Sequence, residues 1–545
     1  MEVKSTAVQP DHHQDNQLES ELAAIKASYD QFPYKSYAFA ASHPAHLRAL
    51  AKLVGLDSPP LATARVLELG CASGGNIIPF AAQYPTSNVV GIDLSEVEIN
   101  AGRDFIQRSG LTNIELKACS ITDVDASWGK FDYIIAHGVF SWVPDAVRDA
   151  MLRISAENLV AQGVAYISYN TLPGWNTLRT IRDMALYHSV NFDTNKEKVN
   201  QSKLLLNFIS DAVQSSDNSY ARLLMESVEL LKDKEDYYIA HDFLELNNKP
   251  FYFSEFMQAA QHHGLQYLSD ASIATMFLGN YPASISEQLA PIKDIVRTEQ
   301  YLDFITNRTF RATLLCHEGV SINRNLNSDV AEQFLLRTQI IPIMPWDDMD
   351  IYNEDEKCDF YFERTSDKTL STQSPILKAV FYALSRHYNQ YVVFDDIANE
   401  ALALLENEDK EAIVAEMNSN LLKLILSGHV KIRLDKPAAN FTVGVYPKAW
   451  EYAKAQSSEL DQDNVTNLFM EGMGLNPFEK YMIRYLDGKS TKEEILDKIM
   501  IHVRNKELDV NYFDKKVISE NRIRCVLSLA YIDAIERFAE NALLV

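Results

Sequence analysis

Short, mainly apolar runs separated by helical patterns organise the first 170 residues of the chain. These runs are Val66–Leu69, Asn88–Ile92, Phe131–Ala136 and Gly163–Tyr169, and they are rich in Val, Ile, Leu and aromatic side chains. Strands that are buried on both faces have this composition, whereas strands with one solvated face alternate. The pattern predicts a parallel sheet wound with helices, so we expect a ligand site beyond the carboxyl ends of the strands.

The first of these strands leads into a glycine-rich turn. Residues Val66–Ile77 read VLELGCASGGNI, a strand–turn–helix layout that suits a nucleotide-like ligand. The second strand ends in Asp93, about 18 residues after Gly75, and a carboxylate at that distance can accept hydrogen bonds from both ribose hydroxyls. The two motifs together predict a site for a ligand that contains a nucleoside.

Glu68 separates the classes of ligand that such a turn can hold. Gly70, Ala72 and Gly75 would also pass as an imperfect dinucleotide fingerprint, but a carboxylate in this strand would repel a pyrophosphate at the helix N-terminus. S-adenosylmethionine carries a sulfonium and an ammonium group and no phosphate, so Glu68 favours this methyl donor. The alternative, a structural turn without a ligand, would leave a buried carboxylate without a partner, which is costly.

Longer segments of the chain resemble the bacterial class I methyltransferases that carry a methyltransferase regulatory domain, among them the rickettsial protein lysine methyltransferases. The matching segments are Tyr29–Pro44, Leu67–Asn76, His137–Pro144, Ser168–Trp175, Tyr237–Tyr252 and Arg308–Cys316. They span about the first 320 residues, and the remainder matches less clearly. The resemblance implies an α/β fold: a Rossmann-like, seven-stranded class I methyltransferase sheet with a helical insert. We expect a mostly α-helical C-terminal region with winged-helix-like modules to follow it.

The resemblance also implies a set of contacts to S-adenosylmethionine. In such enzymes the N-terminal aromatic segment often closes over the cofactor, although core packing is the alternative for its aromatic side chains. The expected cofactor-binding residues are Tyr29, Tyr34, Ser36, Glu68, Gly70, Cys71, Ala72, Ser73, Gly74, Asn76, Asp93, Leu94, Ser120, Ile121 and His137. Two of them depart from the family pattern: Ser120 stands where an acid usually accepts the adenine amino group, and Ala72 replaces the middle glycine. We expect no metal site.

The methyl acceptor should enter next to the ends of the fourth and fifth strands. Methyl transfer from a sulfonium is an in-line displacement, so the protein mainly aligns an unprotonated nucleophile in a dry pocket. A lysine acceptor must first lose a proton, which a desolvated aromatic channel favours. The candidates for this channel are His137, Trp142, Tyr169, Asn170 and Trp175. Core packing is the alternative for the tryptophans, and a structural role is the alternative for His137.

Composition shifts divide the chain into six expected units. These are a disordered leader (1–20), the cofactor-binding core (21–190), a helical insert with a regulatory region that partly completes the sheet (191–325), an acidic linker (326–373), a winged-helix-like module (374–455) and a C-terminal helical module (456–545). The sixth and seventh strands are expected at Gly264–Leu268 and Phe310–Cys316. A strand pair, His429–Leu434 with Phe441–Tyr446, should close the winged-helix-like module.

The net charge and the cysteine content limit the classes of partner and binding site that we expect. The chain has 51 basic and 75 acidic side chains and a net charge of −24, which disfavours nucleic acid and favours a lysine-rich protein substrate. An acidic run around Asp347–Asp359 is typical of a solvated loop, or alternatively attracts a lysine-rich substrate protein by its charge. The five cysteines lack disulfide or zinc spacing. No apolar run is long enough to span a membrane and no signal peptide is visible, so we expect a cytoplasmic protein.

Three functions remain open from the sequence. The first is a protein lysine N-methyltransferase. Its C-terminal modules would bind the substrate protein or, alternatively, form a homodimer. The second is a small-molecule methyltransferase whose pocket is roofed by the helical insert. The third is a non-catalytic protein that binds S-adenosylmethionine for regulation.

Overall fold

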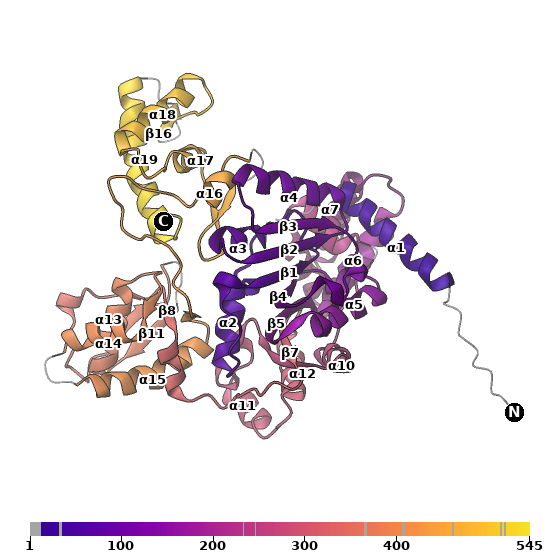
Figure 1. The fold of residues 1–545 in the computed structure, drawn as a ribbon, viewed down its shortest axis with the longest axis horizontal. Helices are drawn as coiled ribbons and strands as arrows, with labels where there is room; N and C mark the ends of the chain where they lie inside the picture. The colour runs from indigo at the N-terminus through magenta and orange to yellow at the C-terminus, as the bar shows by residue number, and fades with distance from the viewer. Residues whose placement is uncertain are drawn as a thin grey trace.

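A seven-stranded sheet lies at the centre of the protein in its computed structural model. The structure describes residues 12–31, 35–232, 234–245, 247–364, 368–405, 409–459, 463–512, 515–516 and 519–545. The strand order is β3-β2-β1-β4-β5-β7-β6 (Figure 1). The strands are β1 (Arg65–Leu69), β2 (Asn88–Asp93), β3 (Ile114–Ala118), β4 (Phe131–Ala136), β5 (Leu159–Asn170), β6 (Leu265–Asp270) and β7 (Phe310–His317). The α/β fold predicted from the apolar runs is confirmed.

Alternate residues of each strand enter different hydrophobic cores, as the two-residue repeat of a strand requires. Val66 and Tyr133, which pair across β1 and β4, pack on the side of α2 (Pro44–Leu53), α3 (Ile78–Gln83) and α4 (Glu96–Ser109). Leu67 and Ile134 pack on the opposite side, with α5 (Asp145–Glu157) and α10 (Phe253–His262). Both faces of the sheet are therefore buried, which explains why the strands read as apolar runs.

The last two strands come from far along the chain. β7 runs antiparallel to β5, with Tyr166 opposite Leu314, and β6 runs antiparallel to β7. Helices α11 (Ala283–Leu289) and α12 (Ile295–Thr306) lie between them in sequence. The prediction that the region after the insert partly completes the sheet is confirmed.

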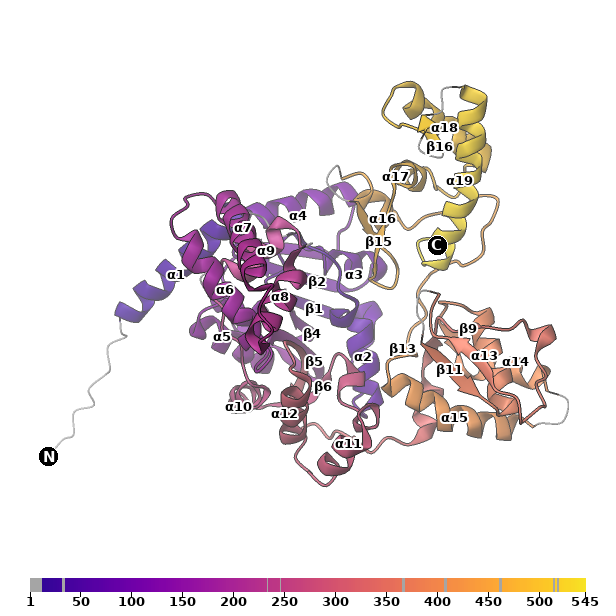
Figure 2. The ribbon, with the colours of Figure 1, turned by 180° about the vertical axis from the view of Figure 1, so that it is seen from behind.

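The predicted helical insert is present and has its own small core. Its helices are α6 (Trp175–Ser189), α7 (Asn195–Val213), α8 (Ser219–Lys232) and α9 (Asp236–Phe243). Ile181, Val199, Leu224 and Phe243 are among the residues of this core. Figure 2 shows the four helices grouped beside α1 (His12–Gln31). Because α1 begins at His12, residues 12–20 of the expected leader belong to this helix, and residues 1–11 of the leader lie outside the described residues.

A separate module follows residue 334, and it includes most of the expected acidic linker. It contains β8 (Leu335–Arg337), β9 (Ile341–Pro342), β10 (Cys358–Tyr361), β11 (Thr369–Thr372), α13 (Pro375–Arg386), β12 (Val392–Val393), α14 (Phe394–Ala403), α15 (Lys410–Leu426) and β13 (Lys431–Arg433). β8 is the central strand between β12 and β13. The predicted pairing of His429–Leu434 with Phe441–Tyr446 is wrong, because β13 pairs with β8 and residues 441–446 form no strand.

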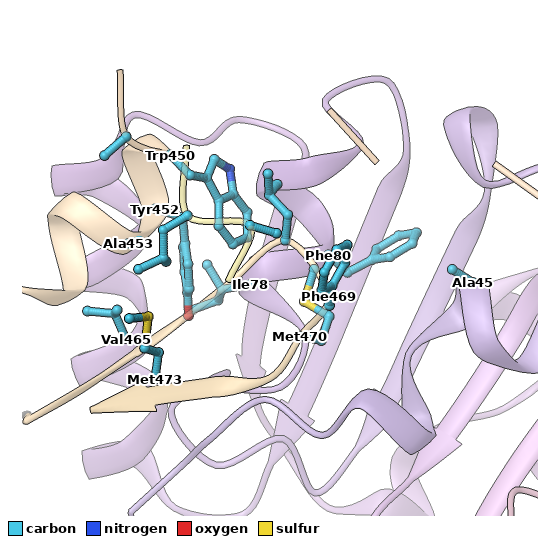
Figure 3. Packing of buried hydrophobic residues seen from close by; sticks show 14 of the residues in the cluster. Ala45, Ile78, Phe80, Trp450, Tyr452, Ala453, Val465, Phe469, Met470 and Met473 are labelled. Carbon is cyan, nitrogen blue, oxygen red and sulfur yellow. The ribbon is translucent and has the colours of Figure 1, made fainter. Parts of the chain in front are cut away.

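The C-terminal module packs against the α3 side of the seven-stranded sheet. Its elements are α16 (Glu451–Gln456), β14 (Asn464–Thr466), β15 (Gly472–Gly474), α17 (Pro477–Arg484), α18 (Lys492–Arg504), β16 (Asn511–Tyr512), β17 (Lys515–Lys516) and α19 (Glu520–Glu540). Figure 3 shows Tyr452 and Phe469 of this module facing Ile78 and Phe80. The Gln83 side chain also donates to the carbonyl oxygen of Leu468, at 3.1 Å. The module and the sheet unit therefore share one hydrophobic core.

Candidate functional site

A cavity of about 430 Å³ lies at the carboxyl ends of the central strands. Loops after β1, β2, β3 and β4 form its floor, and α1 and α9 contribute to its walls. Fifteen of the residues expected in the site line it: Tyr29, Ser36, Glu68, Gly70, Cys71, Ala72, Asn76, Asp93, Leu94, Ser120, Ile121, His137, Trp142, Asn170 and Trp175. The structure thus brings most of the predicted cofactor and acceptor residues to one place.

The glycine-rich turn is held under the cavity by backbone and carboxylate contacts. The amides of Gly70 and Cys71 both donate to the carbonyl oxygen of Ile92, at 2.8 and 2.9 Å. Gly70 has a φ of +74°, and a Cβ there would lie 2.5 Å from a methyl group of Val139. Ala72, in place of the usual glycine, also has a positive φ of +46°, a conformation that is uncommon for residues other than glycine.

Asp93 stabilises this turn from the end of β2. One carboxylate oxygen accepts the amide of Ala72 and the other accepts the amide of Ser95, both at 2.9 Å. Burial raises the pKa of the carboxyl, while these backbone hydrogen bonds lower it. Each carboxylate oxygen can accept a further hydrogen bond, so the Asp93 side chain fits the expected ribose hydroxyls.

Glu68 is the most unusual group in the cavity. Only 2% of the residue is exposed, and one carboxylate oxygen accepts a 2.6 Å hydrogen bond from the Asn76 side-chain amide. The second oxygen, Oε2, is buried and has no hydrogen-bond partner within the described part of the chain. Burial raises the pKa of Glu68 to about 8. A cationic ligand would supply the missing partner, so the site fits S-adenosylmethionine.

The N-terminal aromatic segment is tied to the turn at two points. The Ser36 hydroxyl accepts the amide of Gly75 at 2.8 Å, and the Asn76 side-chain oxygen accepts the amide of Phe39 at 2.9 Å. A Cβ on Gly75 would lie 2.3 Å from the Ser36 carbonyl oxygen, so only glycine allows this approach. Tyr34 falls outside the described residues, and its expected role stays a prediction.

Helices α1 and α9 meet at the cavity. The ring of Tyr29 stacks on His241 with centroids 4.8 Å apart, and the Ser28 hydroxyl donates to Glu245 at 2.6 Å. Below, the Ser95 hydroxyl donates to Asp30 at 2.5 Å. α1 is therefore fixed both to the insert and to the loop after β2.

His137 lies under the aromatic segment rather than in open solvent. Its ring is 3.9 Å from the ring of Phe39, centroid to centroid, and its Nδ1 atom is 2.9 Å from the Tyr166 hydroxyl. Burial lowers the pKa of His137 to about 4, so the imidazole is neutral at physiological pH. It can bind by hydrogen bonds and ring contact, but not as a cation.

Asn170 and two tryptophans form the expected acceptor end. Asn170, 6% exposed, lines the cavity, and its backbone amide donates to the Ser141 hydroxyl at 2.9 Å. The rings of Trp142 and Trp175 are 6.1 Å apart in an edge-to-face arrangement. An amide and two indole rings that line one cavity can orient an amine by hydrogen bonding and exclude water from it.

Three predicted residues do not line the cavity. Tyr169 is 1% exposed, stacks on Phe256 at 4.2 Å and has its hydroxyl 3.0 Å from that of Thr313. It lies on one face of β5, whereas Tyr166 and Asn170 share the other face. Its candidacy as an acceptor residue is therefore wrong. Ser73 and Gly74 belong to the turn but not to the cavity lining.

Ser120 also has a structural role in the loop after β3. Its hydroxyl accepts the amide of Thr122 at 3.2 Å, and its own amide donates to Asp123 at 3.0 Å. It lines the cavity, so a contact with adenine stays a prediction.

Several lining residues were not among the site residues expected from the sequence. These are Leu22, Ile25, Lys26, Tyr37, Phe39, Ser95, Glu98, Gly138, Val139, Val143, Val147, Leu178, Tyr238, His241, Asp242, Thr309 and Phe310. Tyr238, His241 and Asp242 lie within Tyr237–Tyr252, a segment already matched to the family. That match was the available signal for a role of α9 in the site.

Metal ligation and membrane insertion find no support in the described residues. No group of three or more His, Cys, Asp or Glu side chains there is arranged to hold a metal ion. None of the described helices has the length and apolar character needed to cross a bilayer.

Three family models match the chain in order. They are a methyltransferase domain at residues 66–163, a predicted methyltransferase regulatory domain at 235–317 and a "PKMT, C-terminal winged helix domain" at 446–543. The winged-helix match covers most of residues 456–545, which we expected to be a helical module. Of residues 374–455, which we expected to be winged-helix-like, it covers only the end. The regulatory match includes β6 and β7, so this segment contributes to the seven-stranded sheet itself.

Whole-chain similarities agree with these matches. The structure of PKMT2 from Rickettsia typhi in complex with AdoHcy is 37% identical, with a TM-score of 0.88 over 94% of this chain and 100% of that one. A second PKMT2 structure gives a TM-score of 0.86. An uncharacterised protein of Rickettsia prowazekii, RP789, is 44% identical over 95% of this chain and 93% of its own length. The chain therefore belongs to the PKMT2-like family of S-adenosylmethionine-dependent class I methyltransferases with a regulatory and a winged-helix domain.

Proposed function

We propose that this methyltransferase modifies lysine side chains of a protein substrate. The similarity to PKMT2 along 94% of the chain carries the proposal, because PKMT abbreviates protein lysine methyltransferase. The winged-helix domain at 446–543 bears the same name. A net charge of −24 supports it further, since an acidic enzyme attracts lysine-rich partners.

The residues of the cavity have separate roles in this proposal. Glu68 binds the cationic amino-acid end of S-adenosylmethionine, and Asp93 binds its ribose. When bound, the cofactor supplies an electrophilic methyl carbon: the lysine nitrogen forms a bond to it as the carbon–sulfur bond breaks, a proton is released, and S-adenosylhomocysteine remains. Asn170 orients the amine, and Trp142 and Trp175 keep water away from it.

A small-molecule acceptor is the second candidate. The observation that favours it is the position of α1 and α9 beside the cavity, held together by the Tyr29–His241 stack. Such walls would enclose a small substrate well. Glu68 and Asp93 support cofactor binding, which a purely regulatory protein would share, so absence of any methyl transfer would favour that third candidate.

Transfer of radiolabelled methyl from S-adenosylmethionine into a bacterial extract distinguishes the candidates. We expect label in the protein fraction that survives acid and alkali treatment, and no label with Asp93→Ala. Label confined to small molecules would support the second candidate instead. Light scattering of the purified chain tests the proposed homodimer separately.

A further inference from the structure

Asp242 is a carboxylate in the cavity wall that neither the cofactor assignment nor the acceptor candidates use. It lies on α9, between two residues whose positions are fixed by ring contacts. His241 stacks on Tyr29 of α1, and the ring of Phe243 lies 6.3 Å from that of Trp175. The backbone of α9 therefore holds Asp242 in the wall of the cavity that Trp142 and Trp175 also line.

The Asp242 carboxylate lacks a strong cationic partner. It forms no ion pair with any lysine or arginine of the described ranges, and its hydrogen-bond partner is the Tyr238 hydroxyl. Burial raises its pKa to about 6, while this hydrogen bond and the nearby charges of His241 and Lys234 lower it. Asp242 is thus ionised at neutral pH but only partly compensated, which favours the binding of a cation.

The two carboxylates assigned to the cofactor lie near the turn. Glu68 is bonded to Asn76, and Asp93 holds the amides of Ala72 and Ser95. Asp242 comes instead from the helical insert. The ring of its neighbour Phe243 contacts Trp175, which in turn contacts Trp142. A flexible cationic side chain that enters the cavity would meet a carboxylate and aromatic side chains in one lining, a combination that binds ammonium groups.

We propose that Asp242 is the specificity residue that receives the ε-ammonium group of the acceptor lysine before methyl transfer. This assignment rests on the proposed function, since it needs a cationic acceptor. It gives the helical insert a defined role, in which α9 selects the acceptor while the sheet binds the cofactor. Asp242 holds and places the acceptor as an ammonium ion, which then releases a proton to solvent before the neutral amine attacks the methyl carbon.

Two measurements on Asp242→Asn, Asp242→Glu and Asp149→Asn test the proposal. The first is the initial rate of label transfer as a function of the concentration of bacterial-extract protein. The second is the Kd for S-adenosylhomocysteine by calorimetry. Asp149 is the matched control, an exposed carboxylate on α5 that pairs with His263 at 2.8 Å, outside the cavity.

We expect Asp242→Asn to raise the half-saturating acceptor concentration at least tenfold, with Kd for S-adenosylhomocysteine within twofold of wild type. Asp242→Glu should recover part of this loss, and Asp149→Asn should behave as wild type. An unchanged half-saturating concentration in Asp242→Asn would overturn the assignment, as would a loss of S-adenosylhomocysteine binding with a native circular dichroism spectrum. Absence of protein label with the wild-type enzyme would instead overturn the proposed function, and this assignment with it.

Discussion

The side-chain amide of Asn76 donates a 2.6 Å hydrogen bond to one carboxylate oxygen of Glu68, and the other oxygen is buried without a partner among the described residues. The two residues are joined across the turn that carries the cofactor site. Asn76 also accepts the amide of Phe39 at 2.9 Å. Glu68 is thus firmly placed but left electrostatically incomplete, a state that a cationic cofactor would relieve.

Cofactor affinity should therefore depend on pH. Burial raises the pKa of Glu68 to about 8, so the unliganded protein carries a proton there at pH 6, and the cationic cofactor favours its release. We expect the affinity for S-adenosylmethionine to rise roughly tenfold per pH unit between pH 6 and 7.5. Calorimetry in two buffers of different ionisation enthalpy should detect about one released proton per site. Glu68→Gln should flatten the profile.

The same group should destabilise the cofactor-free protein at alkaline pH. A carboxyl whose pKa is higher in the folded than in the unfolded chain costs stability as pH rises from the unfolded value, near 4.5, through about 8. Glu68→Gln should thus raise the free energy of unfolding at pH 8.5 by roughly a few kcal/mol and change little at pH 4.5. Thermal unfolding at the two pH values measures this. Equal effects at both would show that Glu68 is not buried in its neutral form.

Gly75→Ala should detach the N-terminal aromatic segment from the turn. The new Cβ would lie 2.3 Å from the Ser36 carbonyl oxygen, and backbone cannot yield as cheaply as the end of a side chain. We expect S-adenosylmethionine to bind at least tenfold more weakly, with the midpoint of thermal unfolding little changed. Gly319→Ala is the control, because a Cβ there meets nothing within 4 Å. Equal affinities of the two variants for S-adenosylmethionine would show that the N-terminal aromatic segment does not contribute to cofactor binding.

Two neighbours on β5 should differ sharply in their effect on turnover. Asn170 lines the cavity, whereas Tyr169 packs on Phe256 behind the sheet. Asn170→Ala should lower kcat at least tenfold without weakening cofactor binding, since it removes only the group that orients the acceptor. Tyr169→Phe should leave kcat within twofold, because it loses only a buried hydroxyl contact with Thr313. Steady-state kinetics of both variants measure these changes in kcat. A larger loss of kcat in Tyr169→Phe than in Asn170→Ala would place the acceptor on the other face of β5.

The strands and the cofactor end could be predicted from the sequence because their signals are local. Asn88–Ile92 and Phe131–Ala136 mark β2 and β4 almost to the residue. Glu68 and Asp93 each follow from their position relative to one strand. Tyr169 was misassigned because both faces of β5 are buried, so no alternation of polar and apolar residues shows which side chains face the cavity.

The features that escaped prediction depend on contacts between distant segments. β13 pairs with β8 rather than with the next apolar segment, and no local pattern identifies a partner so far back in the chain. Asp242 lies within a helix of ordinary composition and becomes a cavity residue only because α9 folds back against α1. The strength of such contacts comes from tertiary packing, which sequence periodicity does not encode.

Mapping the modified atoms is the decisive measurement for methyl transfer to protein lysines. Bacterial-extract protein would be incubated with the wild-type enzyme and a methyl donor labelled with deuterium, and then digested and analysed by mass spectrometry. We expect deuterated methyl groups on lysine side chains, and none with Asp93→Ala. Deuterated methyl groups confined to other side chains, or to small molecules alone, would contradict it.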